Sequence, residues 1–153
     1  MKIGIVLPNV PVYSETFFSN YLLALKNKGY EIIIFVSSNK KQPAFHDFKV
    51  VQAPNVSTKS LSTFGNIIAL IFKLLFKNFT EAIKLYKLDK QDGVSLIRRI
   101  KNSIINSHFF DYQLDWLHFG YGALAVHREN VARVIGAKMA VSFRGYDYYY
   151  FPQ

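Results

Sequence analysis

The chain has 153 residues, enough for one domain with a sizeable core, and half of its residues are hydrophobic. It lacks cysteine, which excludes disulfides, thiolate zinc sites and cysteine nucleophiles. The formal charge is +9, from 19 Lys and Arg against 10 Asp and Glu. The lysines are scattered rather than interleaved with aromatic residues, so this charge favours an anionic membrane surface or anionic glycan precursors over nucleic acid, with an ordinary basic surface as the alternative.

The N-terminal segment predicts a strand followed by a helix. Ile3–Leu7 is a short continuous apolar run, typical of a strand buried on both faces of a parallel sheet, and it is too short for a signal peptide. Pro8 ends this run. Ser14 is a good helix N-cap, and apolar residues then recur at helical spacing up to Gly29, which favours a left-handed stop. We therefore expect a helix over residues 15–28.

Two further strands are expected next. Glu31–Ser38 contains a second run rich in β-branched residues, and Phe48–Ala53 predicts a third strand that Pro54 closes. A strand, a helix and a strand in this order form a right-handed crossover unit. Such a unit is half of a mononucleotide-binding fold.

Residues 61–88 are strongly apolar, with lysines at positions 73, 77, 84 and 87. Lys73 and Lys77 cut the apolar run short of the ~20 residues that a membrane-spanning helix needs. Two interpretations remain for this segment. It could be an interfacial helix, with lysine stems reaching lipid headgroups, or a core helix, which is the commoner fate of an amphipathic helix. The residues that would enter the acyl boundary are Phe64, Ile68, Ile71, Phe72, Leu75 and Phe79.

The C-terminal half continues the alternation of helices and strands. Val94–Ser107 predicts a basic helix whose buried side is formed by Ile97, Ile100, Ile104 and Ile105. Asp115–Phe119 predicts a strand, followed by a helix that reaches about Ile135 and by a last strand over Lys138–Phe143. Gly136 would end that helix. This alternation predicts a Rossmann-like, doubly wound α/β domain with a mainly parallel sheet.

Ligands of such a domain gather at the carboxyl ends of the strands, where three loops contain candidate residues. The first loop lacks the GxGxxG pattern, which argues against a dinucleotide site. It does contain Ser14, Glu15 and Thr16 at a helix N-terminus, where backbone amides favour an anion or a sugar hydroxyl. The alternative is that Ser14 serves as a cap alone.

The other two loops contain titratable and charged side chains. His118 ends a strand beside Gly120, and its ring could contact a ligand or act in catalysis, although a lone histidine is more often a structural hydrogen-bonding group. Arg144 could bind phosphate or carboxylate and Asp147 a sugar hydroxyl, or the two could form a local ion pair. The four histidines have no ligand-like spacing, so the sequence does not favour a metal site.

At these loops the chain resembles the N-terminal domain of a family 4 glycosyltransferase of the GT-B fold, of the bacterial lipopolysaccharide and polysaccharide biosynthesis type. The resemblance covers nearly the whole chain and rests on three phrases, which are KIGIVLPNVPVYSETFFSNYLLALKNKGYEI, DWLHFGYGALA and VSFRGYD. The order and spacing of these phrases are more specific than any one of them. Many relatives have a Gly-Gly pair in the first loop, where this chain has Tyr13 and Ser14.

The resemblance implies transfer of a sugar from a nucleotide-sugar donor to a saccharide or lipid-linked acceptor, with retention of anomeric configuration and without a cofactor or an essential metal ion. The acceptor-binding residues that it implies are Ser14, Glu15, Thr16, Arg144 and Asp147. The implied donor-binding residues are Ser14 and Gly120, and the implied catalytic residue is His118. The absence of cysteine suits a cytoplasmic location, and the basic helices would hold the protein at the inner face of the cell membrane.

The family's E-x7-E motif and the basic groups that stabilise the departing diphosphate belong to a C-terminal domain, so residues 1–153 are interpreted as the acceptor-side half alone. Charge on the leaving group must be met by preorganised donors, and we therefore expect no sugar transfer by this chain by itself. The alternative function is a non-enzymatic, flavodoxin-like binding module that recruits a partner through Tyr146–Phe151. An RNA-binding domain would rest on charge alone and lacks a motif.

Overall fold

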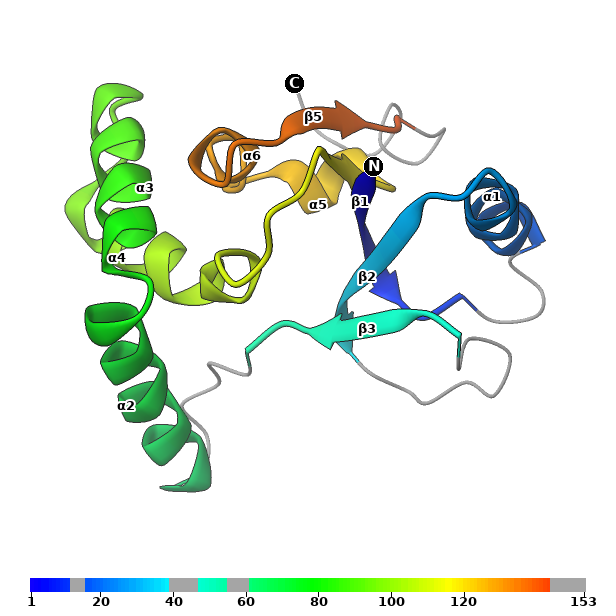
Figure 1. Ribbon diagram of the computed structural model, residues 1–153. Helices are drawn as coiled ribbons and strands as arrows, with labels where there is room; N and C mark the ends of the chain where they lie inside the picture. Colours follow the sequence, from blue (N-terminus) through cyan, green and yellow to red (C-terminus); the bar gives the residue numbers. More distant parts are fainter. Residues whose placement is uncertain (12–15, 39–46, 55–60, 144–153) are drawn as a thin grey trace.

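A computed structural model shows five parallel strands in one sheet, with helices on both faces (Figure 1). It describes residues 1–11, 16–38, 47–54 and 61–143, and of residues 16, 61–64, 66 and 67 it describes the backbone alone. The strands lie in the order β3-β2-β1-β4-β5. Their bounds are β1 (Lys2–Asn9), β2 (Glu31–Ser38), β3 (Lys49–Gln52), β4 (Trp116–Phe119) and β5 (Lys138–Val141).

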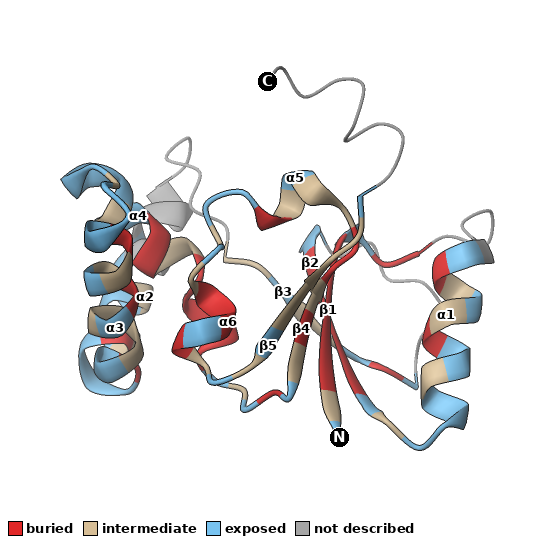
Figure 2. Cartoon of the chain, turned by 90° about the horizontal axis from the view of Figure 1, so that it is seen from above, coloured by how far each residue is buried: buried red, intermediate tan, exposed pale blue. Residues whose placement is uncertain are grey.

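One helix packs on one face of this sheet, and the remaining helices lie on the other side. The helix on the first face is α1 (Thr16–Asn27). The helices on the second side are α2 (Leu61–Phe76), α3 (Phe79–Gln91), α4 (Leu96–Ile105), α5 (Gly122–Ala125) and α6 (Val131–Val134). In Figure 2, α1 stands apart from the other helices, with the buried central strands between them. The predicted Rossmann-like, doubly wound fold is confirmed.

The apolar runs of β1 and β2 supply two cores, because alternate residues of a strand point to opposite faces. On the α1 side, Ile5 and Ile34 pack with Leu22, and all three side chains are fully buried. On the other side, Val6 and Phe35 pack with buried residues of α2, α3, β4 and α6. The absence of polar residues between Ile3 and Leu7 is thus explained by burial on both faces of the sheet.

The strand order identifies the topology more closely than the sequence did. The chain runs outward from β1 to β3, returns past β1, and continues outward from β4 to β5. This is the order of the Rossmann arrangement, whereas the flavodoxin arrangement has the order 2-1-3-4-5. The flavodoxin-like label of the alternative interpretation therefore does not describe this sheet.

β1 continues through Pro8 to Asn9, beyond the end expected from the sequence. The carbonyl of Val6 accepts a hydrogen bond from the amide of Gly120, so the backbone polar groups of Val6 point toward β4. Pro8, two residues further on, faces the same side at a point where the ladder to β4 has ended. Its missing amide hydrogen therefore removes no bond from the sheet.

The apolar segment 61–88 forms two helices, α2 and α3, that meet at Lys77 and Asn78. The side chain of Asn78 is buried and donates to Asp111 at 3.3 Å, which fixes the corner between the helices. Among the described side chains of α2, Leu74 alone is buried. The core-helix interpretation thus holds for the side of α2 that contains Leu74. Most of the large apolar side chains described on α2 face outward.

The orientation predicted for the helix over 94–107 was wrong. Ile97 and Ile100 of α4 are exposed, and Ile104 and Ile105 are partly buried, while Asn102 and Ser103 are buried. The reason is a polar partner on α3: Asn102 donates to the buried carboxylate of Asp89 at 2.7 Å. This helix therefore packs through its polar side.

The single helix expected up to Ile135 is divided into α5 and α6. His127, between them, has a φ of 64°, which no regular right-handed helix accommodates. Gly29 and Gly136 do have positive φ at the ends of their helices, as the sequence predicted. In the part of the chain that the structure describes, no helix combines the length and the apolar composition needed to cross a membrane.

Candidate functional site

The switch point of the sheet lies between β1 and β4, where the chain leaves neighbouring strands toward opposite faces. After β1 it turns toward α1, and after β4 it turns toward α5. Because the strands are parallel, their carboxyl ends meet at one edge, and diverging loops open a crevice there. The described residues line a cavity of about 50 Å³ at this place, formed by Leu7, Pro8, Asn9, Phe18 and Tyr121.

Gly120 lies directly after β4, beneath Leu7 and Phe18 of the crevice. A Cβ atom at this position would lie 2.6 Å from Cδ2 of Leu7 and 2.8 Å from Cζ of Phe18. Both neighbours are buried, so the absence of a side chain lets β1, α1 and β4 meet closely. The structure thus gives Gly120 a packing role at the crevice, and its predicted contact with a donor stays a prediction.

His118 lies on β4 and faces α1. Its Nδ1 is 3.1 Å from the hydroxyl of Tyr21, and its Nε2 is 2.8 Å from the hydroxyl of Ser142. A neutral imidazole has one donor and one acceptor nitrogen, and hydroxyl groups can serve either. The chain Tyr21–His118–Ser142 therefore links α1, β4 and the segment after β5.

This hydrogen-bonded chain has a defined chemical capacity. Burial raises the pKa of Tyr21, so its phenol stays protonated at physiological pH and can donate or accept. A ligand hydroxyl could replace Ser142 at Nε2 of His118, with Nδ1 still oriented by Tyr21. Such an arrangement suits recognition of a hydroxyl or transfer of one proton.

Sequence reasoning did not assign Tyr21 or Ser142 to a site. Tyr21 falls within the predicted first helix, and Ser142 falls within the predicted last strand and the phrase VSFRGYD. Their meeting depends on β1 pairing with β4, with Ile5 opposite His118, across more than a hundred residues of sequence. Helical spacing in 16–27 and the phrase around Ser142 were the available signals, but neither indicates which strand lies under α1.

The other predicted site residues have no described side chain. Ser14, Glu15, Arg144 and Asp147 lie outside the described residues, and Thr16 is described as the backbone that begins α1. The described neighbours of these segments are Pro11, two residues after β1, and Phe143 after β5. In the described ranges, no group of three His, Asp or Glu side chains could hold a metal ion.

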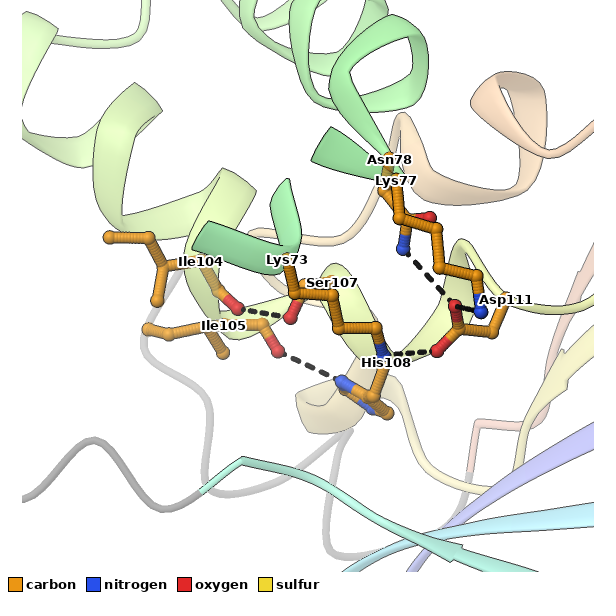
Figure 3. A network of polar contacts seen from close by, with 8 residues as sticks. All are labelled: Lys73, Lys77, Asn78, Ile104, Ile105, Ser107, His108 and Asp111. Carbon is orange, nitrogen blue, oxygen red and sulfur yellow. Dashed lines mark hydrogen bonds and ion pairs between the residues drawn. The ribbon is translucent and has the colours of Figure 1, made fainter. Parts of the chain in front are cut away.

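A second polar cluster lies apart from the crevice, where α2, α3 and the segment after α4 meet (Figure 3). Asp111 accepts hydrogen bonds from Lys73 and Asn78 and pairs with Lys77 at 3.1 Å. Burial raises the pKa of Asp111, but these hydrogen bonds outweigh burial and hold the pKa below its usual range. The carboxylate therefore fastens the corner between α2 and α3 to the body of the protein.

His108 lies buried beside this cluster and donates from Nδ1 to the carbonyl of Ile105 at 2.9 Å. Burial and the nearby guanidinium of Arg128 lower the pKa of His108 from 6.5 to about 4. Burial also lowers the pKa of Arg128. The imidazole is accordingly neutral at physiological pH and packs against Phe109, with ring centroids 4.0 Å apart.

Neither the known protein-family models nor the curated proteins contain a match to this chain. The chemistry of the crevice is therefore inferred from its geometry together with the sequence phrases around it.

Proposed function

We propose that this chain is the acceptor-side half of a retaining glycosyltransferase. Its substrates would be a nucleotide-sugar donor and a saccharide or lipid-linked acceptor, with no metal ion or other cofactor required. The observation that carries the proposal is the position of the three sequence phrases: each runs through the carboxyl end of a parallel strand, namely β1, β4 or β5. Three phrases distant in sequence thus meet at one edge of the sheet, where α/β proteins bind ligands.

The size of the crevice supports a site shared between two lobes. A cavity of about 50 Å³ holds about one water molecule, whereas pockets that enclose small ligands measure ~300–1,000 Å³. In this proposal, the described residues would form one wall of a ligand site. A second, donor-binding lobe would supply the opposite wall and the groups that stabilise the departing diphosphate.

Within this proposal, His118 faces the reacting sugar, and Gly120 lies at the donor side of the crevice. Ser14, Glu15 and Thr16 would contact the acceptor after β1, and Arg144 and Asp147 would do so after β5. The proposal includes a cytoplasmic location at the inner face of the cell membrane, where lipid-linked acceptors and nucleotide sugars meet.

The proposal is tested by NMR titration of the purified chain with lipopolysaccharide core oligosaccharides and with nucleotide sugars. We expect the oligosaccharides to shift the amide signals of Asn9, Gly120, Tyr121 and Ser142, which surround the crevice. His118→Gln should weaken this binding about fivefold, since one charge-neutral hydrogen bond is worth ~1 kcal/mol. Leu23→Gln, an exposed change on α1, is the matched control and should bind normally.

Two results would contradict the proposal. Sugar transfer by this chain alone would show that no second lobe is needed. Unshifted signals with every saccharide in the panel would remove the acceptor role and leave the non-enzymatic binding module as the better explanation.

A further inference from the structure

A large apolar surface lies on the side of the molecule formed by α2, α3 and α4. We call it the apolar face and define it by Ile68, Ile71, Phe72, Leu75, Phe76, Phe79, Ile97 and Ile100, all of which are exposed. Phe76 is 83% exposed and Ile97 is 68% exposed. A groove of about 300 Å³, lined mainly by apolar side chains, runs between the helices. Monomeric soluble proteins rarely expose contiguous apolar surface on this scale without an interaction partner.

The packing of α4 holds its exposed isoleucines in a defined, outward orientation. Its polar side is held inward, since Asn102 donates to buried Asp89 and Ser103 donates to the carbonyl of Ala82, both on α3. The guanidinium of Arg99 lies 4.6 Å from the ring of Tyr86 on α3. These contacts fix the rotation of α4 and turn Ile97 and Ile100 outward.

Positive charge surrounds the apolar face. Residues 61–105 include eight basic and three acidic side chains, and one of the acidic side chains, that of Asp89, is buried. Lys73 and Lys77 are paired with Asp111. The basic side chains left exposed to solvent are Lys84, Lys87, Lys90, Arg98 and Lys101. Lys101 follows Ile97 by four residues, so helical spacing places it beside the isoleucine stripe.

We propose that the apolar face docks onto an anionic lipid bilayer. Exposed Phe, Ile and Leu side chains could enter the acyl boundary, and the long stems of the surrounding lysines could carry their ammonium groups to the lipid phosphates. Each basic residue near an anionic membrane contributes ~1 kcal/mol. A second copy of the chain fits this face less well, because two basic borders would then oppose each other.

This inference extends the membrane-peripheral location that the proposed function includes. It rests on that proposal only for which membrane the protein binds. The apolar face and the crevice are different surfaces made by different elements. Loss of lipid binding and loss of saccharide binding can therefore be observed independently in the same protein.

The test is flotation of the purified chain with vesicles of phosphatidylcholine, with and without phosphatidylglycerol. We expect the protein to float with the anionic vesicles and to be released by high salt. Phe72→Glu/Phe76→Glu should abolish flotation, while Leu23→Glu on α1, the same kind of change at an exposed apolar residue, should not. Circular dichroism would verify that all variants are folded.

The electrostatic part is tested by a pair of charge variants. Lys90→Gln/Lys101→Gln should weaken binding to the anionic vesicles at least about tenfold. Lys26→Gln/Lys28→Gln removes the same charge at the C-terminal end of α1, on the opposite side of the sheet, and should bind nearly as the unmodified chain does. Equal recovery with neutral and anionic vesicles, or no flotation at all, would overturn the inference. A dimer or a complex with an acidic protein that the phenylalanine variant abolishes, without vesicle binding, would likewise overturn it.

Discussion

Gly120 shows how closely β1, α1 and β4 approach one another at the crevice. An alanine methyl group there would overlap with Leu7 and Phe18, which are both buried and have little room to move. Overpacking of this kind typically costs about 1–3 kcal/mol. The residue matters for the site because its missing side chain lets Leu7 and Phe18 pack directly over the end of β4.

We predict that Gly120→Ala lowers the free energy of unfolding by about 2 kcal/mol in urea denaturation. Gly65→Ala is the control, since Gly65 lies in α2 with open space around its Cα. That variant should gain up to ~1 kcal/mol from improved helix propensity. Equal stabilities of the two variants would contradict the close packing at the crevice.

His108 gives the protein a pH-dependent stability. Its pKa of about 4 in the folded state lies below the ordinary value of 6.5, so the unfolded chain binds more protons between these values. Stability is therefore complete above pH ~6.5 and is lost as the pH falls toward 4. Asp111, whose pKa is lowered from 3.8, acts below this window and leaves it undisturbed.

We predict that the unmodified chain loses about 2 kcal/mol of unfolding free energy between pH 7 and pH 5, measured by urea denaturation. His108→Gln should be less stable at pH 7 but should show a much flatter dependence on pH. His127→Asn, a change at an exposed histidine with positive φ, serves as the control and should retain the original slope. An unchanged slope in His108→Gln would refute the assignment.

At the scale of elements, a polar seam joins α3 and α4 beside their apolar contacts with the core. Asp89 is buried and accepts hydrogen bonds from Asn102 of α4 and, at 3.0 Å, from Asn130 before α6. The carboxylate of Asp89 thus sets the rotation of α4 and links it to the start of α6. The seam is the reason that the isoleucine stripe of α4 faces outward.

We predict that Asp89→Ala lowers the free energy of unfolding by about 2 kcal/mol, because two amide groups lose their acceptor at a buried position. Asp92→Ala removes an exposed carboxylate that contacts the same Asn130 and should change stability by less than ~0.5 kcal/mol. Thermal and urea denaturation of the two variants measure this difference. If Asp89→Ala proved as mild as Asp92→Ala, the seam would not determine the packing.

At the scale of the whole molecule, the sheet and the apolar face differ in how firmly they are held. The central strands are buried on both faces, whereas α2 contributes Leu74 to the core and is fastened at its C-terminal end by Asp111 (Figures 2 and 3). Regions with few buried contacts open at lower free energy than the core of the same protein. The two regions should therefore differ in hydrogen exchange.

We predict that amides of α2 exchange much faster than those of β1, as measured by hydrogen exchange with mass spectrometry. Addition of anionic vesicles should slow exchange in α2 to α4 and leave the strands unaffected. Neutral vesicles are the control. Protection of α2 equal to that of β1 in the absence of lipid would contradict this picture.

Sequence patterns predicted those parts of the fold that depend on residues close together in the chain. The apolar runs of β1 and β2, the helix that ends at Gly29 and the last strand all follow from spacing and from turn residues. The rotation of α4 was mispredicted because Asn102 finds its partner on another helix. Similarly, the contact of Tyr21 with His118 depends on which strands are neighbours, and periodicity carries no information about that.

The position of β1 has a consequence for the synthesis of this protein. β1 occupies the middle of the sheet and is translated well before its partner β4, which begins at Trp116. At ~5–20 residues per second, the unit of β1, α1 and β2 waits roughly ten seconds before β4 has been translated. During that interval one side of β1 presents unpaired backbone groups, so the nascent chain is most exposed to misassociation before the residues around His118 have emerged.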